Sequence, residues 1–239
     1  MIAKRILASK TVWRLTGATY TTAVMATHGR YVPISEYLDD CSTQMELLQG
    51  VMIGRKNVLE FGCGLGGNLL SISDNTIKGV GLDVNPGYLR IAKRIAKRCR
   101  ISNVDFILYD GLDMSDILLD RPDLVFTIGV FERIPKEQVL TYLRWLSILL
   151  IPGGRLISYF LTDRARNSAF TRRLGDGSYV YWSSSELREI GTKLEMDLVE
   201  KISWPACPFI KGGSGESFAD VLVLDKPLNV GSSQNSRIN

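Results

Sequence analysis

The feature that most constrains the fold is a glycine-rich turn that directly follows a short apolar run. Val58-Leu59-Glu60-Phe61 has the composition of a buried β-strand, and Gly62-Cys63-Gly64-Leu65-Gly66-Gly67 follows it. Glycine tolerates positive φ and lets a ligand approach the backbone where another residue would place a Cβ. In open parallel α/β sheets, ligands bind outside the carboxyl ends of the strands. The turn therefore predicts an α/β fold with a ligand site at that edge.

Short apolar runs alternate with helical stretches from residue 57 to residue 160, which is the pattern of βαβ units. The runs are rich in Val, Ile and Leu, as expected for parallel strands that are covered on both faces. The predicted strands are Asn57–Phe61, Gly79–Asp83, Val104–Tyr109, Leu124–Ile128 and Arg155–Phe160. The predicted helices begin near Gly67, Pro86, Ser115 and Pro135.

The C-terminal third completes the predicted sheet. A helix is expected at Ser184–Leu194, followed by strands at Met196–Ser203 and Phe218–Leu224 that pair antiparallel at the sheet edge. The length of 239 residues suits one large α/β domain. The expected organisation is a basic arm or lid at 1–34, a domain at 35–228 with a lid-like insert at 161–183, and a disordered tail at 229–239.

The net charge of +4 resides in the N-terminal arm. The first 35 residues carry five basic side chains and no acidic one, whereas the remainder has 24 basic and 25 acidic residues. Three interpretations fit such an arm: a transit-type presequence, a patch for nucleic acid or lipid headgroups, or a helix that lies over the active site. We favour the helix, because a cleaved presequence would remove the aromatic content between Tyr20 and Tyr31.

Composition excludes several other classes of protein. No apolar run approaches the roughly 18 residues that a membrane-spanning helix needs. The four cysteines form no Cys-x-x-Cys pair and have no histidine nearby, so neither a structural zinc site nor a disulfide framework is indicated. A reducing, cytoplasmic compartment is therefore expected.

The predicted helix Pro86–Arg100 is amphipathic. Its apolar residues recur at helical spacing, and the opposite face carries Arg90, Lys93, Arg94, Lys97 and Arg98. A basic strip of this kind can bind RNA. A solvated outer face is the more common reason for such a strip, because long cationic side chains often coat exposed helices.

The glycine turn alone fits two classes of cofactor. Gly62, Gly64 and Gly67 also satisfy the Gly-x-Gly-x-x-Gly pattern of nicotinamide and flavin enzymes. Asp83 suits both classes, since both cofactors carry ribose hydroxyls. Glu60 discriminates between them, because a carboxylate just before the turn favours a cofactor with a positively charged amino group and repels a pyrophosphate.

At this point the chain resembles the class I S-adenosylmethionine-dependent methyltransferases, in particular their small-molecule subgroup. The segment from Glu60 to Gly66 resembles their first motif, Glu/Asp-x-Gly-x-Gly-x-Gly. The later motifs follow in order at Gly81-Leu82-Asp83-Val84-Asn85, Tyr109-Asp110-Gly111, residues 123–135 and residues 150–156. The resemblance covers roughly residues 35 to 225. It implies a Rossmann-like, seven-stranded, mostly parallel sheet of order 3-2-1-4-5-7-6, with the last strand antiparallel and helices on both faces.

The resemblance also implies roles for individual residues in binding S-adenosylmethionine. The turn residues Gly62, Cys63, Gly64 and Gly66 would pass beneath the methionine part of the cofactor, and Glu60 would support its amino group. Asp83 would hold the ribose hydroxyls. The adenine pocket would be formed by Val84, Asp110, Gly111 and Leu112, and Ile128, Gly129 and Val130 would lie nearest the sulfonium. Each residue also has a structural interpretation; Cys63 is better explained as a small filler of the turn than as a nucleophile.

The acceptor is less well determined. The fourth motif lacks the Asn/Asp-Pro-Pro-aromatic run of enzymes that methylate exocyclic amino groups of adenine, and no cysteine stands in a cytosine-C5 context. Residues 129–135 resemble a Phe-Glu-His-Ile/Val-Pro run, with Arg133 in place of the histidine. Arginine stays protonated and cannot act as a base, although it can bind an anionic substrate. His28 is then the one neutral base among the candidates.

The sequence therefore predicts methyl transfer from S-adenosylmethionine to oxygen or nitrogen of a small or medium-sized acceptor. The catalytic candidates are His28 and Arg133, and no metal is expected. The acceptor site is expected between the arm, with Tyr20, His28 and Tyr31, and the insert, with Tyr179, Tyr181 and Trp182. Alternatives are an RNA methyltransferase, a non-catalytic cofactor-binding subunit and, less favoured because of Glu60 and Asp110-Gly111, a nicotinamide oxidoreductase.

Overall fold

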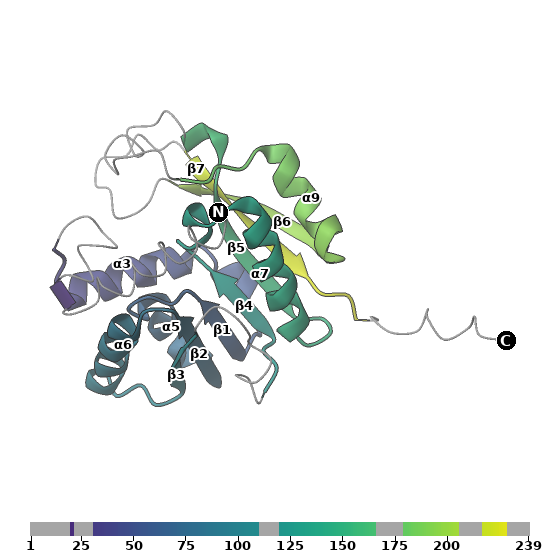
Figure 1. The fold of residues 1–239 in the computed structure, drawn as a ribbon. Helices are drawn as coiled ribbons and strands as arrows, with labels where there is room; N and C mark the ends of the chain where they lie inside the picture. The colour runs from purple at the N-terminus through teal and green to yellow at the C-terminus, as the bar shows by residue number, and fades with distance from the viewer. Residues whose placement is uncertain (1–19, 22–30, 110–119, 166–178, 206–216, 229–239) are drawn as a thin grey trace.

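The computed structural model describes residues 20–21, 31–109, 120–165, 179–205 and 217–228 (Figure 1). These residues form one seven-stranded sheet of order β3-β2-β1-β4-β5-β7-β6. The strands are β1 (Asn57–Phe61), β2 (Lys78–Asp83), β3 (Val104–Leu108), β4 (Leu124–Thr127), β5 (Arg155–Leu161), β6 (Asp197–Pro205) and β7 (Ser217–Asp225). The predicted strand order is confirmed.

Strands β1 to β5 pair in parallel, and β7 runs antiparallel to both of its neighbours. The antiparallel last strand is therefore also confirmed. The predicted bounds of β1 match the observed ones, and the other strand ends differ from the predicted ones by at most two residues, as at Lys78 and Leu161. Such shifts are expected because strand ends depend on pairing with neighbours rather than on local composition.

Helices cover both faces of the sheet (Figure 1). They are α3 (Ile34–Glu46), α4 (Gln49–Met52), α5 (Gly67–Ser71), α6 (Pro86–Arg98), α7 (Lys136–Leu149) and α9 (Ser184–Leu194), with 3-10 turns η1 (Ser73–Asn75), η2 (Phe131–Arg133) and η3 (Asp163–Ala165). Side chains of α3, α5 and α6 pack into one apolar cluster, and those of α7 and α9 pack into the other. The two clusters are the two layers of core that the continuous apolar strands predicted.

Local sequence explains where the helices begin. Asn85 caps α6 because its side chain accepts from the backbone N–H groups of Gly87 and Tyr88, and Pro86 occupies the first helical position. Ser183 and Glu186 form a reciprocal capping box at the start of α9. The predicted helix Ser184–Leu194 matches α9 at both ends. The start predicted near Ser115 lies outside the described residues.

Helix α3 was not predicted from the sequence. It lies along α5 and buries Tyr37, Cys41, Gln44 and Met45, which recur at helical spacing. The arm at residues 1–34 was expected to cover the active site, and most of it lies outside the described residues. Helix α3 does contact the glycine turn, but it begins at Ile34, at the end of that arm.

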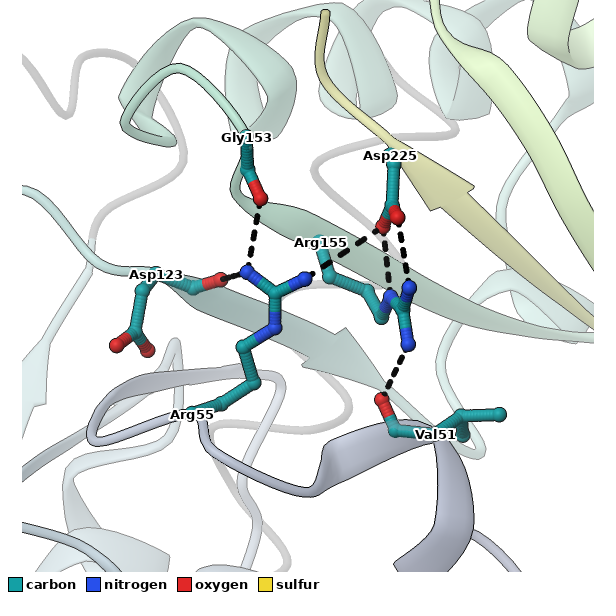
Figure 2. Close-up of polar contacts among 6 residues, drawn as sticks. All are labelled: Val51, Arg55, Asp123, Gly153, Arg155 and Asp225. Carbon is teal, nitrogen blue, oxygen red and sulfur yellow. Dashed lines mark hydrogen bonds and ion pairs between the residues drawn. The ribbon is translucent and has the colours of Figure 1, made fainter. Parts of the chain in front are cut away.

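A charged cluster lies at the edge of the sheet where β5 begins and β7 ends (Figure 2). Arg155 at the start of β5 makes two 2.6 Å hydrogen bonds to Asp225 at the end of β7, and it donates to the carbonyl of Val51. Arg55 donates to the carbonyl of Gly153 at 2.8 Å and lies 3.9 Å from Asp225. The cluster joins the start of β5, the end of β7 and the segment that precedes β1. Among the described residues, no helix is long and apolar enough to cross a membrane.

Candidate active site

The site is built where β1, β2 and β4 end side by side. Glu60 lies opposite Gly81 of β2 on one side and Phe126 of β4 on the other. The glycine turn leaves β1 directly after Phe61, and Asp83 is the last residue of β2. The parallel register thus brings together the carboxylates and the turn that the sequence predicted.

The glycines of the turn are required for different structural reasons. Gly62, Gly64 and Gly66 all have positive φ, at 75°, 55° and 78°. A Cβ on Gly62 would lie 2.3 Å from Cγ2 of Val130, and a Cβ on Gly66 would overlap the ring of Phe106. At Gly64, by contrast, no described atom lies within 4 Å of that position. Gly64 is therefore the point where the backbone is bare toward open space.

The N–H groups of the turn are already hydrogen-bonded within the protein. Gly62 and Cys63 both donate to the carbonyl of Leu82, at 2.8 and 2.9 Å. Gly64 donates to Oδ2 of Asp83 at 2.9 Å. The remaining two contacts run from Gly66 to the carbonyl of Cys63 and from Gly67 to the hydroxyl of Tyr37. Few amides of the turn remain to bind an anion.

Asp83 holds the turn to the start of the next helix. Its Oδ2 accepts from Gly64, and its Oδ1 accepts from the backbone of Asn85 at 2.8 Å. Burial raises the pKa of Asp83, and the hydrogen bonds from Asn85 and Gly64 oppose that rise. The following residue, Val84, is half-buried and packs on the apolar cluster of α7 and α9.

Glu60 is the most deeply buried carboxyl of the site, with 1% of its surface exposed. Its Oε1 accepts from Nδ2 of Asn68 at 3.1 Å. Its Oε2 is buried and has no hydrogen-bond partner among the described residues, and the same is true of Oδ1 of Asn68. Burial raises the pKa of the Glu60 carboxyl to about 8. Two acceptor oxygens thus stand ready for a ligand that brings N–H donors.

Helix α3 supports the glycine turn from below. The hydroxyl of Tyr37 accepts from the N–H of Gly67 at 2.9 Å, and Sγ of Cys41 lies against the same glycine. Cys63 is buried with its sulfur against Gly81. The thiol therefore packs against β2, which supports its interpretation as a small filler of the turn.

The β4 end forms the second wall of the site. Ile128 and Val130 are half-buried, Gly129 has a φ of 72°, and the Val130 side chain covers Gly62. In η2, the guanidinium of Arg133 lies 3.8 Å above the ring centre of Tyr179 and donates to its hydroxyl. The backbone of Val180 donates to the carbonyl of Glu132 at 2.8 Å. The end of the insert is thereby docked beside the β4 loop.

Some predicted site residues fall outside this arrangement. Trp182 is 3% exposed and packs edge-to-face on Phe160, so it belongs to the core rather than to an acceptor pocket. Tyr20, by contrast, contacts both Tyr31 and Tyr37 edge-to-face, so it lies beside the residue that supports Gly67, and its hydroxyl donates to the carbonyl of Val32. His28, Asp110, Gly111 and Leu112 lie outside the described residues.

Sequence reasoning did not single out Asn68, Tyr37 or Glu132. Asn68 directly follows the last glycine of the turn. Its polar side chain at the start of a helix, eight residues after Glu60, was the signal that could have identified it. Tyr37 gave no signal, because its contact with Gly67 joins residues that are 30 positions apart. Among the described residues, no group of three His, Cys, Asp or Glu side chains is placed to hold a metal ion.

Residues 58–154 match a family model described as a methyltransferase domain. An uncharacterised protein of Rickettsia prowazekii is 31% identical over 105 residues, which are 43% of this chain and 42% of that protein. The chain thus spans less than half the length of this curated relative.

Solved methyltransferases share the fold. Magnesium protoporphyrin IX methyltransferase from Synechocystis PCC 6803, crystallised with SAH (S-adenosyl-L-homocysteine), is 16% identical with a TM-score of 0.66, over 91% of this chain and 99% of that one. The N-methyltransferase NodS from Bradyrhizobium japonicum WM9, also with SAH, is 19% identical with a TM-score of 0.63, over 92% and 98%. The methyltransferase CcbJ from Streptomyces caelestis is 16% identical with a TM-score of 0.63, over 88% and 99%.

Proposed function

We propose, from the premise that residues 58–154 belong to the class I S-adenosylmethionine-dependent methyltransferase family, that this chain is an enzyme of methyl transfer. Its methyl donor is S-adenosylmethionine. Its acceptor is an oxygen or nitrogen atom of a small or medium-sized molecule.

The observation that carries the proposal is the combination of occupied turn amides and an unpartnered buried carboxylate. A dinucleotide needs free N–H groups at a helix start to hold its pyrophosphate. Here five amides of the glycine turn, including that of Gly67 at the helix start, are used internally, and α5 has only five residues. Glu60 beside the turn favours a cationic amino group and opposes a phosphate.

The residues present fit S-adenosylmethionine. Oε2 of Glu60 and Oδ1 of Asn68 offer acceptors to its amino group, and Gly64 leaves room above the turn. When bound, the donor supplies a methyl group that is already activated by a sulfonium. Crystals of the Synechocystis and Bradyrhizobium methyltransferases contain the product of this donor, SAH, which supports the same assignment for this chain.

The remaining donor contacts follow the family pattern. Asp83 binds the ribose hydroxyls, Val84 packs on the adenine, and Asp110, Gly111 and Leu112 form the adenine pocket. Ile128, Gly129 and Val130 lie at the sulfonium, which agrees with the contact between Val130 and Gly62. The protein's contribution is to bind and align, since alignment supplies much of the acceleration of an in-line displacement.

On the acceptor side, Arg133 and Tyr179 form a stacked pair beside the β4 loop. Because the guanidinium keeps its charge, we propose that this pair orients an anionic or aromatic part of the acceptor. His28 stays a candidate base. The basic face of α6 is exposed, which keeps RNA as the alternative acceptor.

The expected cytoplasmic location and the division into arm, domain and tail are also proposals. Cys41 and Cys63 are buried and Cys99 is exposed, and all three are free thiols, which supports a reducing compartment.

The test is transfer of tritiated methyl from S-adenosylmethionine into fractionated cell extract, with Asp83→Ala as the inactive control. We expect label in the small-molecule fraction and none with the variant. Label found only in RNA would contradict a small-molecule acceptor and favour the alternative, an RNA methyltransferase. Donor binding without transfer into any fraction would favour the non-catalytic subunit.

A further inference from the structure

We propose that Glu132 is a catalytic residue whose carboxylate faces the reacting methyl group and accepts the proton of the acceptor. This inference rests on the proposed function. It assigns the role of base to a residue that neither the family resemblance nor the fourth motif singled out, and it leaves His28 without that role.

The position of the carboxylate relative to the β4 loop is the first observation. Glu132 lies in η2, two residues after the loop of Ile128, Gly129 and Val130. A Cβ on Gly129 would lie 3.7 Å from Oε1 of Glu132, and apart from the two chain neighbours of Gly129 no other described atom lies within 4 Å of that position. Since Val130 covers Gly62 of the glycine turn, this loop and the turn are in contact. The carboxylate therefore borders the bare side of Gly129, next to the donor site.

The second observation is that one oxygen of the carboxylate has no hydrogen-bond donor in the described part of the chain. Oε2 of Glu132 is buried and has no hydrogen-bond partner among the described residues. A buried oxygen without a donor destabilises a fold, and a ligand bound beside Gly129 would supply the missing donor. An acceptor hydroxyl or amine carries the required O–H or N–H.

The charges around Glu132 leave it able to take a proton. Arg133 is the neighbouring cation, and its guanidinium is held over the ring of Tyr179. Burial raises the pKa of Tyr179, and the charges of Arg133 and Glu132 act on its hydroxyl in opposite directions. Burial raises the pKa of Glu132 to about 7, with Arg133 opposing the rise. A base is most effective when its pKa lies near the working pH.

The proton balance of the step is complete. The acceptor's oxygen or nitrogen forms its bond to the methyl carbon, and the electron pair of the carbon–sulfur bond leaves on sulfur. The acceptor's proton passes to Oε2 of Glu132, and the neutral acid then returns it to water. Because the donor's positive charge is lost in the same step, the carboxylate interacts more strongly with the donor than with its product.

That difference can be measured without knowing the acceptor. S-adenosylmethionine and SAH share the amino group that Glu60 faces, but only the first carries the sulfonium charge. The ratio of their affinities, measured by calorimetry at pH 6 and pH 8, therefore isolates a carboxylate at the sulfonium. If the sulfonium lowers the Glu132 pKa from about 7 to about 6, the ratio rises about fivefold toward the donor between these pH values.

Two matched variants decide the assignment. In Glu132→Gln, the ratio of the S-adenosylmethionine and SAH affinities should be the same at pH 6 and pH 8, and SAH should bind as it does to the wild type at pH 6. Glu60→Gln, with the same chemical change on the other side of the turn, should keep the rise. A flat ratio in the wild type, or a rise that persists in Glu132→Gln, overturns the proposal. Glu132→Asp, which retains the charge, should keep a rise and guards against a folding defect of the glutamine variant. A wild type that binds neither ligand instead refutes the proposed function.

Discussion

The substitution Glu60→Gln is predicted to stabilise the ligand-free protein and to weaken donor binding. Burial raises the pKa of Glu60 to about 8 in the folded chain, from an ordinary value of 4.5. The folded chain therefore holds a proton that the unfolded chain releases above pH 4.5. The cost to stability is absent below pH 4.5, grows as the pH rises to 8, and is constant above it. Glutamine is neutral throughout and removes this cost.

The expected magnitude follows from these two pKa values. Between pH 5.5 and pH 8, the free energy of unfolding of the wild type should fall relative to the variant by about 3 kcal/mol. In the donor complex the effect reverses, because an ammonium near the carboxylate favours its charged form. The variant should then lose tenfold or more in affinity for SAH at pH 8, as expected for loss of a buried charge-assisted hydrogen bond.

The assay is urea unfolding of both proteins at pH 5.5 and pH 8, with calorimetry of SAH at the same pH values. The control is Asp105→Asn, which changes an exposed carboxylate of β3 by the same chemistry. Any contribution of Glu132 is common to the wild type and the Glu60 variant and cancels in the comparison. Parallel pH dependences in these two proteins would refute the reasoning about Glu60.

Three further substitutions test the packing around the site by urea unfolding. Gly62→Ala should lower the free energy of unfolding by about 2 kcal/mol or more, because alanine is strained at positive φ and its Cβ would meet the Val130 side chain. Adding Val130→Ala should restore part of this stability, and no restoration would exclude the overlap as a cause. Arg155→Ala should lower the free energy of unfolding by roughly 2 kcal/mol, because the half-buried carboxylate partner on β7 loses its bidentate contact. An unchanged urea midpoint would show that the cluster of Figure 2 adds little stability. Tyr37→Phe should lower the free energy of unfolding by about 1 kcal/mol and weaken SAH binding several-fold, because the N–H of Gly67 loses its acceptor. An unchanged SAH affinity would show that α3 does not contribute to the donor site.

The parts of the fold that the sequence predicted are those that local pattern decides. Continuous Val, Ile and Leu runs marked the buried parallel strands, and the predicted helix Ser184–Leu194 matches α9, whose start the local Ser183–Glu186 capping box fixes. The glycine turn marked the site because positive φ restricts the residue types that can occupy it. Family resemblance then supplied the strand order, which local pattern alone does not determine.

The parts that were missed depend on contacts between distant segments. Helix α3 is recognised by the residues it buries, but its place under the glycine turn depends on Tyr37 meeting Gly67. The unsatisfied oxygens of Glu60, Asn68 and Glu132 are properties of burial, which no spacing pattern reports. Trp182 was assigned to the acceptor side by its neighbours in sequence, whereas its ring packs on Phe160 in the core.

The most direct test of the central claim is calorimetry of the purified chain with S-adenosylmethionine and, separately, with NADH. The arrangement of Glu60, Asp83 and the occupied turn amides predicts one binding site for S-adenosylmethionine and no detectable binding of NADH. Asp83→Ala should abolish the first titration, because it removes the proposed ribose contact and the partner of Gly64. Binding of NADH alone, or S-adenosylmethionine binding that Asp83→Ala leaves unchanged, would contradict the assignment of the glycine turn as a methyl-donor site.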